Sequence, residues 1–289
     1  MTAKIHVKKA VPTDFAAIYP LLLKFNSPHI SKEKWQRLFS DYWSFQPGFC
    51  GYTLNHGEKI VGFFAYILSE KLINGHMEKW CNLSSWIVAD EFRSSSMDLL
   101  YPVLDLNDYT ITSLTANPGA FKIQTKLFHF KILDTAEVFI PALLTPWTRL
   151  NGKCHVITGK QNISPYLSPY EQKVFQDHRS FDCIHLVVTT QQGYVYLICR
   201  RIYRKHLPFA KIYYISNSEL FLDLLPQMRF NVPWALKTAG IIIDQRFLRG
   251  KSIPFAKAKS FYTPILYKSQ RLLPHEIDSL YSELFLLEF

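Results

Sequence analysis

The chain has 289 residues, of which 48% are apolar, 15% aromatic and 19% charged, with a net charge of +10. This composition excludes a disordered or fibrous protein, and at about 150 residues per domain the length predicts two domains with real cores. The longest apolar stretch, residues 60–68, is about half of the ~18 residues that a membrane span needs, which excludes transmembrane helices.

The cysteines and the charge distribution limit the cellular compartment and the class of partner. The N-terminus builds no apolar block of the secretory kind, and the five cysteines contain no Cys-x-x-Cys pair. Both features favour a cytoplasmic protein with reduced thiols. Residues 1–150 carry 15 Lys and Arg against 13 Asp and Glu, whereas residues 151–289 carry 18 against 10. The basic second half indicates an anionic partner such as a phosphate-bearing cofactor, a nucleic acid or an anionic glycan.

The first half alternates strand and helix patterns. Pro12-Thr13-Asp14 is a capping signal for a helix, and Asn55-His56-Gly57-Glu58 suits a tight turn between two strands. In chain order, the predicted elements are strand 5–7, helix 15–25, helix 31–39, strands 51–54 and 59–68, strand 79–88, helix 97–104, strand 109–114, helix 118–127 and one or two strands within 128–140. This order favours an open mixed sheet covered by helices.

The second half repeats this rhythm loosely. Pro141, Pro146 and Asn151-Gly152 mark the predicted boundary between a domain at 1–145 and a domain at 152–289. The predicted elements are a helix from 168, strands 183–189 and 194–200, strand 211–215, helix 219–228, strand 241–244 and a closing helix within 274–287. The recurrence of hairpin, strand, helix and strand indicates an internal repeat.

Several short motifs follow one another in the first half with a familiar order and spacing. They are Pro12-Thr13-Asp14, Glu58-Lys59-Ile60-Val61-Gly62, Ser85-Trp86-Ile87-Val88 leading into Glu91-Phe92-Arg93, and the segment 126–134. Over most of residues 4–135 the chain resembles the GNAT superfamily, whose members move an acyl group from acyl-coenzyme A to an amine. The second half resembles a more divergent GNAT-like domain through its element order alone. The resemblance implies two mixed α/β domains, each with a mostly antiparallel sheet flanked by helices.

The resemblance also implies cofactor-binding residues. The family's phosphate turn, [QR]xxGx[GA], corresponds to Arg93-Ser94-Ser95-Ser96-Met97-Asp98. Arg93 matches the pattern and Ser96 is a small replacement for glycine, whereas the Asp98 carboxylate would repel a pyrophosphate. By resemblance, the cofactor contacts are Trp86, Ile87, Val88, Arg93, Ser94, Ser95, Ser96 and Asn117.

Residues for proton transfer are less defined. The tyrosine that often serves as the acid in this superfamily is replaced by Gln124 or Thr125. Glu78 is the candidate catalytic base, with His76 beside it, and either can act through water. Alternatively, both are solvent-facing turn residues.

Two further clusters have structural explanations. Asp177, His178, Asp182, Cys183 and His185 lack the paired spacing of a zinc site, which favours a helix end and a strand start. The basic run 200–206 could bind phosphates or stack on a base. Because Arg200 and Arg201 point to opposite faces of a strand, we favour a solvated hairpin edge.

Three functions therefore stay open. The first is an acyltransferase that uses acetyl-CoA or another acyl-CoA, needs no metal, and acts on an amine or hydroxyl of a small molecule or sugar precursor. The second is a non-catalytic binding protein with the GNAT fold, supported by Asp98 and the missing tyrosine. The third is a Fem-type transferase that uses aminoacyl-tRNA, supported only by the basic second half.

Overall fold

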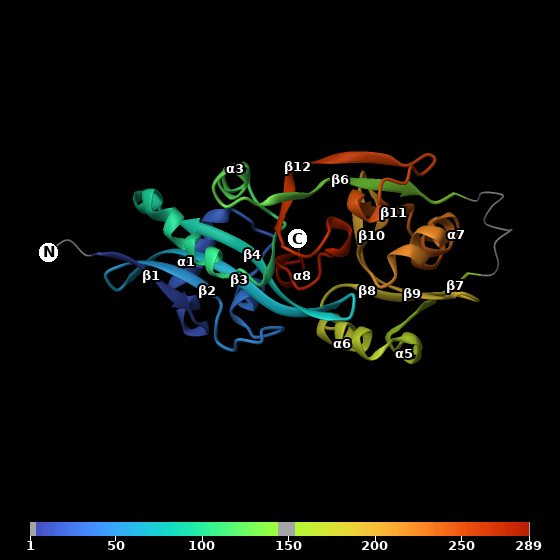
Figure 1. Ribbon diagram of the computed structural model, residues 1–289, viewed down its shortest axis with the longest axis horizontal. Coiled ribbons are helices and arrows are strands. Elements are labelled where there is room, and N and C mark those ends of the chain that lie inside the picture. The colour runs from blue at the N-terminus through green and yellow to red at the C-terminus, as the bar shows by residue number, and fades with distance from the viewer. Residues whose placement is uncertain (1–3, 144–153, 289) are drawn as a thin grey trace. The chain divides into compact units, whose positions relative to one another are not determined.

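The computed structural model describes residues 4–143 and 154–288. Within these residues, a similar series of six strands with intervening helices occurs twice along the chain, and the elements are labelled in Figure 1. The first occurrence comprises β1 (Ile5–Ala10), α1 (Phe15–Leu22), α2 (Lys32–Gln36), β2 (Gly51–His56), β3 (Lys59–Ile73), β4 (His76–Val88), β5 (Tyr109–Ser113), α3 (Pro118–Leu127) and β6 (Lys131–Pro141). The second comprises β7 (His155–Thr158), α5 (Lys160–Ile163), α6 (Pro169–His178), β8 (Ile184–Thr190), β9 (Gly193–Arg204), β10 (Leu207–Ile215), α7 (Ser218–Leu236), β11 (Gly240–Asp244) and β12 (Lys257–Lys268), after which α8 (Glu283–Leu286) follows.

The described residues form two compact units, and each unit takes a strand from the other half of the sequence. The first unit contains residues 4–132, 265–273 and 281–288, and the second contains 133–143, 154–264 and 274–280. The boundary predicted at 145–152 lies outside the described residues.

Strand pairing is the same in both units. In the first, β1, β2, β3 and β4 are antiparallel neighbours, β5 is parallel to β4, and the end of β12 is antiparallel to β5. In the second, β7, β8, β9 and β10 are antiparallel neighbours, β11 is parallel to β10, and β6 is antiparallel to β11. The predicted mixed, mostly antiparallel sheets flanked by helices are confirmed.

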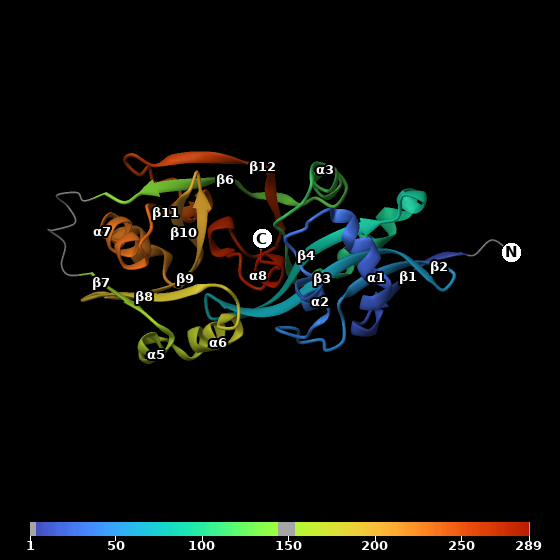
Figure 2. The ribbon, with the colours of Figure 1, turned by 180° about the vertical axis from the view of Figure 1, so that it is seen from behind.

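Helices cover the sheet of the first unit. Helix α1 packs against β3 and α2 packs against α1, on the side nearest the viewer in Figure 2. Phe39 of the turn after α2 stacks on Phe63 of β3, with ring centroids 5.1 Å apart. A second cluster joins Phe64, Leu83 and Leu99 between the sheet and the helical turns that follow β4. In the second unit, α7 packs Phe221, Met228 and other apolar residues on β9, β10 and β11.

Two predicted helices differ from the structure. Residues 97–104 lie in 3₁₀ helices, Asp90–Leu99 and Tyr101–Asp105, because three consecutive serines and Pro102 disfavour an α-helix there. The closing helix predicted within 274–287 is split into a 3₁₀ turn, Pro274–Glu276, and α8. Tyr281 interrupts it with a φ of 56°. Across the described residues, no helix combines the length and apolar character needed to cross a membrane.

Candidate functional site

The parallel strands β4 and β5 separate partway along their length. Their pairing ends at Asn82 and Thr112. Beyond these residues β4 stays beside β3 as far as Val88, whereas the chain after β5 continues to α3. We call the space between residues 83–88 and residues 113–117 the first fork. Ligands of open α/β sheets bind where neighbouring strands diverge.

A bulge lies on the β4 side of the first fork. The register with β3 shifts between Phe63 and Ala65, where Ser85 and Trp86 of β4 face a single residue of β3. Ser85 has a φ of 56°, in the left-handed region that non-glycine residues rarely adopt. Bulges beside active sites change the direction of side chains and end strand pairing. The first fork thus has an irregular main chain along one wall.

A cavity of about 200 Å³ occupies the first fork. One wall is apolar and comprises Phe25, Trp35, Phe64, Leu83 and Trp86. The other is polar and comprises Ser27, Ser84, Ser85, Ser113, Thr115, Asn117 and Gln124. No Lys, Arg, Asp or Glu is among the described residues that line the cavity. Its walls therefore suit the uncharged part of a ligand.

Two of the predicted cofactor residues meet at this cavity. The Trp86 indole stacks on Phe64 with ring centroids 5.3 Å apart, and its Nε1 donates to the Ser96 carbonyl at 3.2 Å. Asn117 begins α3, because its Oδ1 accepts from the Ala120 N–H at 2.9 Å. Trp86 thus ties the turn after β4 to the first fork.

The predicted phosphate turn lies outside the lining of this cavity. Arg93 is exposed and its Nη2 lies 2.6 Å from Asp90 Oδ1. Ser94 is exposed, and Ser95, Ser96 and Asp98 are half-buried. Ile87 and Val88 remain paired with β3. The structure therefore brings Trp86 and Asn117 together at the cavity and leaves the roles of the phosphate turn as predictions.

Of the two residues that could replace the family's tyrosine, Gln124 lines the cavity and Thr125 does not. The Thr125 hydroxyl donates to the Phe121 carbonyl at 2.7 Å, so it is bound to its own helix. Gln124 is only 2% exposed, and its Oε1 has no hydrogen-bond partner among the described residues. A buried acceptor of this kind is costly. A ligand with an N–H or O–H group would satisfy it.

Glu78, the candidate base, lies at another cavity. This cavity of about 310 Å³ is lined by Glu78, residues 107–110 and residues 269–271. Glu78 is 4% exposed, and its Oε2 accepts from Arg271 Nη2 at 3.1 Å. The alternative that it faces solvent is wrong. It precedes Ser84 by six residues, about 20 Å along a strand, so its role as a base remains a prediction.

The sequence analysis missed Glu283. It is fully buried, and its Oε1 accepts from the Thr115 hydroxyl, a cavity residue, at 2.7 Å. Its N–H donates to Asn82 Oδ1 at 3.2 Å. Burial raises the pKa of Glu283 to about 7, although hydrogen bonding, that from Thr115 first, opposes the shift. The only sequence signal was an acidic residue in a predicted amphipathic helix.

In the second unit, β10 and β11 separate in the same way. Their pairing ends at Lys211 and Ile242, and β10 is irregular at Tyr213. We call the space beyond this pairing, between residues 212–215 and 243–244, the second fork. The segment 274–280 lies here, because the Ser279 N–H donates to the Tyr213 carbonyl at 3.4 Å.

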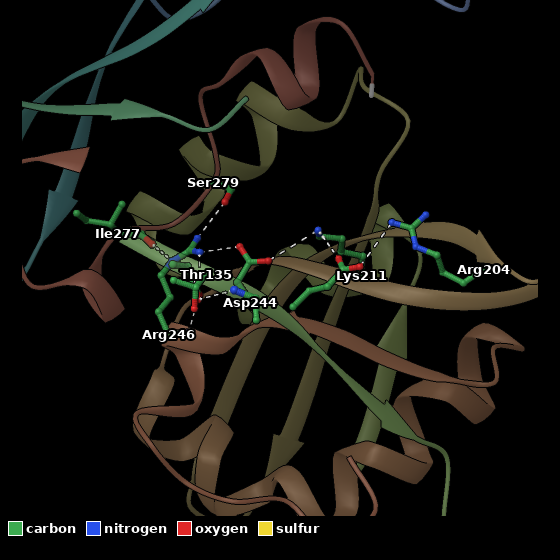
Figure 3. Close-up of polar contacts among 10 residues, drawn as sticks. Thr135, Arg204, Lys211, Asp244, Arg246, Ile277 and Ser279 are labelled. Carbon is green, nitrogen blue, oxygen red and sulfur yellow. Dashed lines mark hydrogen bonds and ion pairs between the residues drawn. The ribbon is translucent and has the colours of Figure 1, made fainter. Parts of the chain in front are cut away.

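A network of buried charges surrounds the second fork (Figure 3). The Arg246 side chain is 2% exposed, and its Nη1 lies 2.7 Å from Asp244 Oδ2 and 3.5 Å from Asp134 Oδ2. Its Nε donates to the Ile277 carbonyl at 3.0 Å and its Nη2 to the Ser279 hydroxyl at 3.1 Å. The donors of the Arg246 guanidinium are thus hydrogen-bonded to groups of this chain.

The basic run 200–206 is not a solvated edge throughout, because β9 lies between β8 and β10. Arg200 is 6% exposed, and its Nε donates to the Asp182 carbonyl at 2.8 Å. Arg201 Nη2 donates to the Leu236 carbonyl at 2.6 Å. The two arginines thus have separate partners, and the prediction of a solvated edge is wrong for Arg200.

The acidic and histidine-rich cluster near residue 180 has protein partners. His185 lies 2.6 Å from the Tyr196 hydroxyl and 3.3 Å from Cys183 Sγ, and burial lowers its pKa to about 4. His178 Nδ1 lies 2.9 Å from the Val174 carbonyl. In residues 4–143 and 154–288, no three His, Cys, Asp or Glu side chains gather as metal ligands would.

Solved structures resemble the chain over most of its length. A GCN5-related N-acetyltransferase from Anabaena variabilis ATCC 29413 matches 91% of this chain and 72% of its own, with a TM-score of 0.60 and 9% identity. A probable N-acyltransferase from Enterococcus faecalis V583 matches 95% and 74%, with a TM-score of 0.57 and 11% identity. A GCN5-related N-acetyltransferase from Kribbella flavida matches 92% and 71%, with a TM-score of 0.52 and 10% identity. No protein-family model and no curated protein matches the sequence. The chain has the GNAT fold.

Proposed function

We propose that this chain is an acyl-CoA-dependent acyltransferase whose first fork holds the acyl group and the adjoining arm of coenzyme A. The observation that carries the proposal is the cavity at a bulged fork between β4 and β5, in a chain with the GNAT fold. The cosubstrate supplies a thioester carbonyl. The pantetheine arm is uncharged and carries amide N–H groups, which fits walls without charged residues and the unpartnered Oε1 of Gln124.

The chain's own residues would serve the reaction as follows. The main chain at the Ser85 bulge would donate to the oxyanion that develops on the acyl carbonyl, a contact that stabilises the transition state more than the ground state. The aromatic wall of Trp35, Phe64 and Trp86 would exclude water. A cavity without charged walls favours an acceptor amine in its neutral, nucleophilic form, because desolvation disfavours the ammonium ion.

The proposed acceptor is a small molecule or sugar precursor that carries an amine or hydroxyl. Arg93 and the adjoining serines would contact the pyrophosphate at the surface, beyond the cavity. The binding protein without catalysis remains the second candidate, because Asp98 is half-buried in a 3₁₀ turn where the family pattern has a small residue. The Fem-type transferase remains the third hypothesis.

Thermal unfolding with coenzyme A, acetyl-CoA, longer acyl-CoAs and tRNA tests the proposal. A ligand at ~100 times its Kd stabilises the folded state by about 2.7 kcal/mol, which raises the Tm by several degrees in a chain of this size. Ala120→Phe should fill the cavity and abolish the acyl-CoA shift. Lys126→Phe, which places the same side chain on the exposed side of α3, should leave the shift intact.

Release of free coenzyme A in the presence of a panel of primary amines and amino sugars separates catalysis from binding. An acyl-CoA shift with turnover supports the transferase. A shift without turnover for any amine or alcohol favours the binding protein. A wild-type chain that responds to tRNA and to no acyl-CoA contradicts the proposal in favour of the Fem-type transferase.

A further inference from the structure

A hydrogen bond connects the solvent-accessible cavity of the first fork to a buried carboxyl group. Thr115 lines the cavity and is exposed, whereas Glu283 is fully buried. The Thr115 hydroxyl donates to Glu283 Oε1 at 2.7 Å. Thr115 is therefore within reach of a substrate in the cavity, whereas Glu283 is covered.

The chain holds Glu283 at the closed end of the first fork. Its N–H donates to Asn82 Oδ1 at 3.2 Å, and Asn82 Nδ2 donates to Thr112 Oγ1 at 3.0 Å. Asn82 and Thr112 are the residues at which the β4–β5 pairing ends. The carboxyl group is thus fixed relative to both strands that form the cavity walls.

Within residues 4–143 and 154–288, the second carboxylate oxygen of Glu283 lacks a partner that would stabilise a negative charge. Glu283 Oε2 is buried and has no hydrogen-bond partner among the described residues. An ionised carboxylate with one unsolvated oxygen is poorly stabilised, and uptake of a proton removes that cost. The group therefore has a structural reason to change its protonation state when a proton becomes available at Thr115.

Charged groups that contact or belong to residues 281–288 have partners of their own. Lys71 Nζ lies 3.6 Å from the centre of the Trp80 ring and 5.5 Å from that of Tyr281. Glu288 is paired with Lys34 at 2.9 Å and with Arg37 at 2.7 Å. The raised pKa of Glu283, about 7, has burial as its main cause, and the groups that oppose it, Thr115, the main chain of Glu283 and Asn82, are all neutral. Near neutral pH such a group can both accept and release a proton.

We propose that Thr115 receives the proton that the acceptor amine loses during acyl transfer and passes its own hydroxyl proton to Glu283. This inference rests on the proposed function. The amine nitrogen forms a bond to the acyl carbon, the carbon–sulfur bond breaks, and the thiolate of coenzyme A leaves with the electron pair. The amine proton goes to Thr115 Oγ1 as the Thr115 proton goes to Glu283 Oε1. After the product leaves, the proton returns from Glu283 through Thr115 to water in the cavity. Thr115 is the catalytic residue and Glu283 the positioning residue that gives Thr115 its basicity.

The pH dependence of kcat tests this role, with an aromatic amine as acceptor so that the acceptor itself titrates at a more acidic pH. In the wild type, kcat should rise through a limb centred near pH 7. In Glu283→Gln, which keeps an acceptor for the Thr115 hydroxyl, kcat should fall at least ~100-fold and the limb should disappear. The KM for acyl-CoA should stay unchanged. Glu58→Gln, an exposed turn position, is the control.

Thr115 provides a second pair of variants if the buried substitution disturbs folding. Thr115→Val should lower kcat to a similar extent, whereas Thr115→Ser should restore the wild-type profile. Both should keep the acyl-CoA-induced rise in Tm. A wild-type limb and full turnover in Glu283→Gln, or in Thr115→Val, would overturn the inference and leave the proposed function standing. A wild-type protein that neither binds acyl-CoA nor turns over would remove the proposed function and the inference together.

Discussion

The first and second forks share a backbone plan and differ in what their side chains do with it. In each, a parallel strand pair separates after a few residues, beside an irregularity in the longer strand. The first retains a cavity lined by uncharged residues, whereas the second holds residues 274–280, which are hydrogen-bonded to Tyr213 and Arg246. The GNAT fold alone therefore does not decide where a ligand binds.

The C-terminal segment makes the difference. Residues 274–280 bring the Ile277 carbonyl and the Ser279 hydroxyl to Arg246 in the second unit. Residues 281–288 bring Glu283 to Thr115 in the first unit. In one place the segment satisfies a buried charge, and in the other it leaves a carboxyl group one hydrogen bond away from an open cavity. The segment therefore fills the second fork, whereas the chemistry proposed above belongs to the first.

The largest expected effect is the loss of stability when Arg246, which binds the segment in the second fork, is replaced. Arg246→Ala removes the cation between Asp134 and Asp244 and should lower the free energy of unfolding by about 3–5 kcal/mol, because an unpaired buried charge is strongly destabilising. Guanidinium-induced unfolding measures this loss. Arg249→Ala, which breaks the partly exposed pair with Glu219, should cost less than about 1 kcal/mol. Equal losses in the two variants would contradict a special role for Arg246.

The next effect concerns the buried carboxyl group of the first fork. The pKa of Glu283 is raised from 4.5 to about 7, so the unfolded chain releases this proton at lower pH than the folded chain does. Wild-type stability should therefore fall as the pH rises from about 4.5 to 7, by about 3 kcal/mol relative to Glu283→Gln. Thermal unfolding of both proteins at pH 5 and pH 8 measures the difference. A difference that does not change with pH would place the carboxyl group in a wetter environment.

Local patterns made most of the first unit predictable. The hairpin of β2 and β3 follows from its turn residues, and α3 has the predicted bounds because Asn117 and Pro118 mark its start. Helix α7 was predicted to end at Met228, yet it continues to Leu236 through Pro233. Packing against β9, β10 and β11 supports it beyond Pro226 and Pro233, and a sequence pattern does not contain that support.

The candidate site was only partly predictable, for a related reason. Trp86 lies within a motif of the resemblance, Asn117 was expected from the resemblance as a cofactor contact, and both line the cavity. Glu283 is 168 residues from Thr115 along the chain, and Arg246 is 112 residues from Asp134. Contacts between residues so far apart in the sequence leave no periodicity or spacing to detect. The position of Glu283 beside the cavity and the contacts of Arg246 could therefore be found only in the structure.

A smaller effect is expected at Gln124, where one substitution should weaken acyl-CoA binding without lowering the free energy of unfolding. Gln124→Leu removes a buried acceptor that has no partner among the described residues, so the variant should be as stable as the wild type or more stable by about 1 kcal/mol. Acyl-CoA binding should nevertheless weaken by about tenfold if this oxygen accepts from the ligand, since tenfold corresponds to about 1.4 kcal/mol. Calorimetric titration and thermal unfolding of the variant measure both quantities. Unchanged affinity would assign Gln124 to packing alone.

The smallest effect should come from the phosphate turn. Arg93 is exposed and already paired with Asp90, so Arg93→Gln should weaken acyl-CoA binding only a few-fold, and less at high salt because surface charges are screened. Asp98→Ser should strengthen binding by a similar factor, since it removes a like charge near the pyrophosphate. Titrations at two salt concentrations, with Lys126→Gln on α3 as the neutralised control, measure these changes. A loss of a hundredfold or more in Arg93→Gln would mean that the turn, and not the cavity of the first fork, supplies most of the affinity.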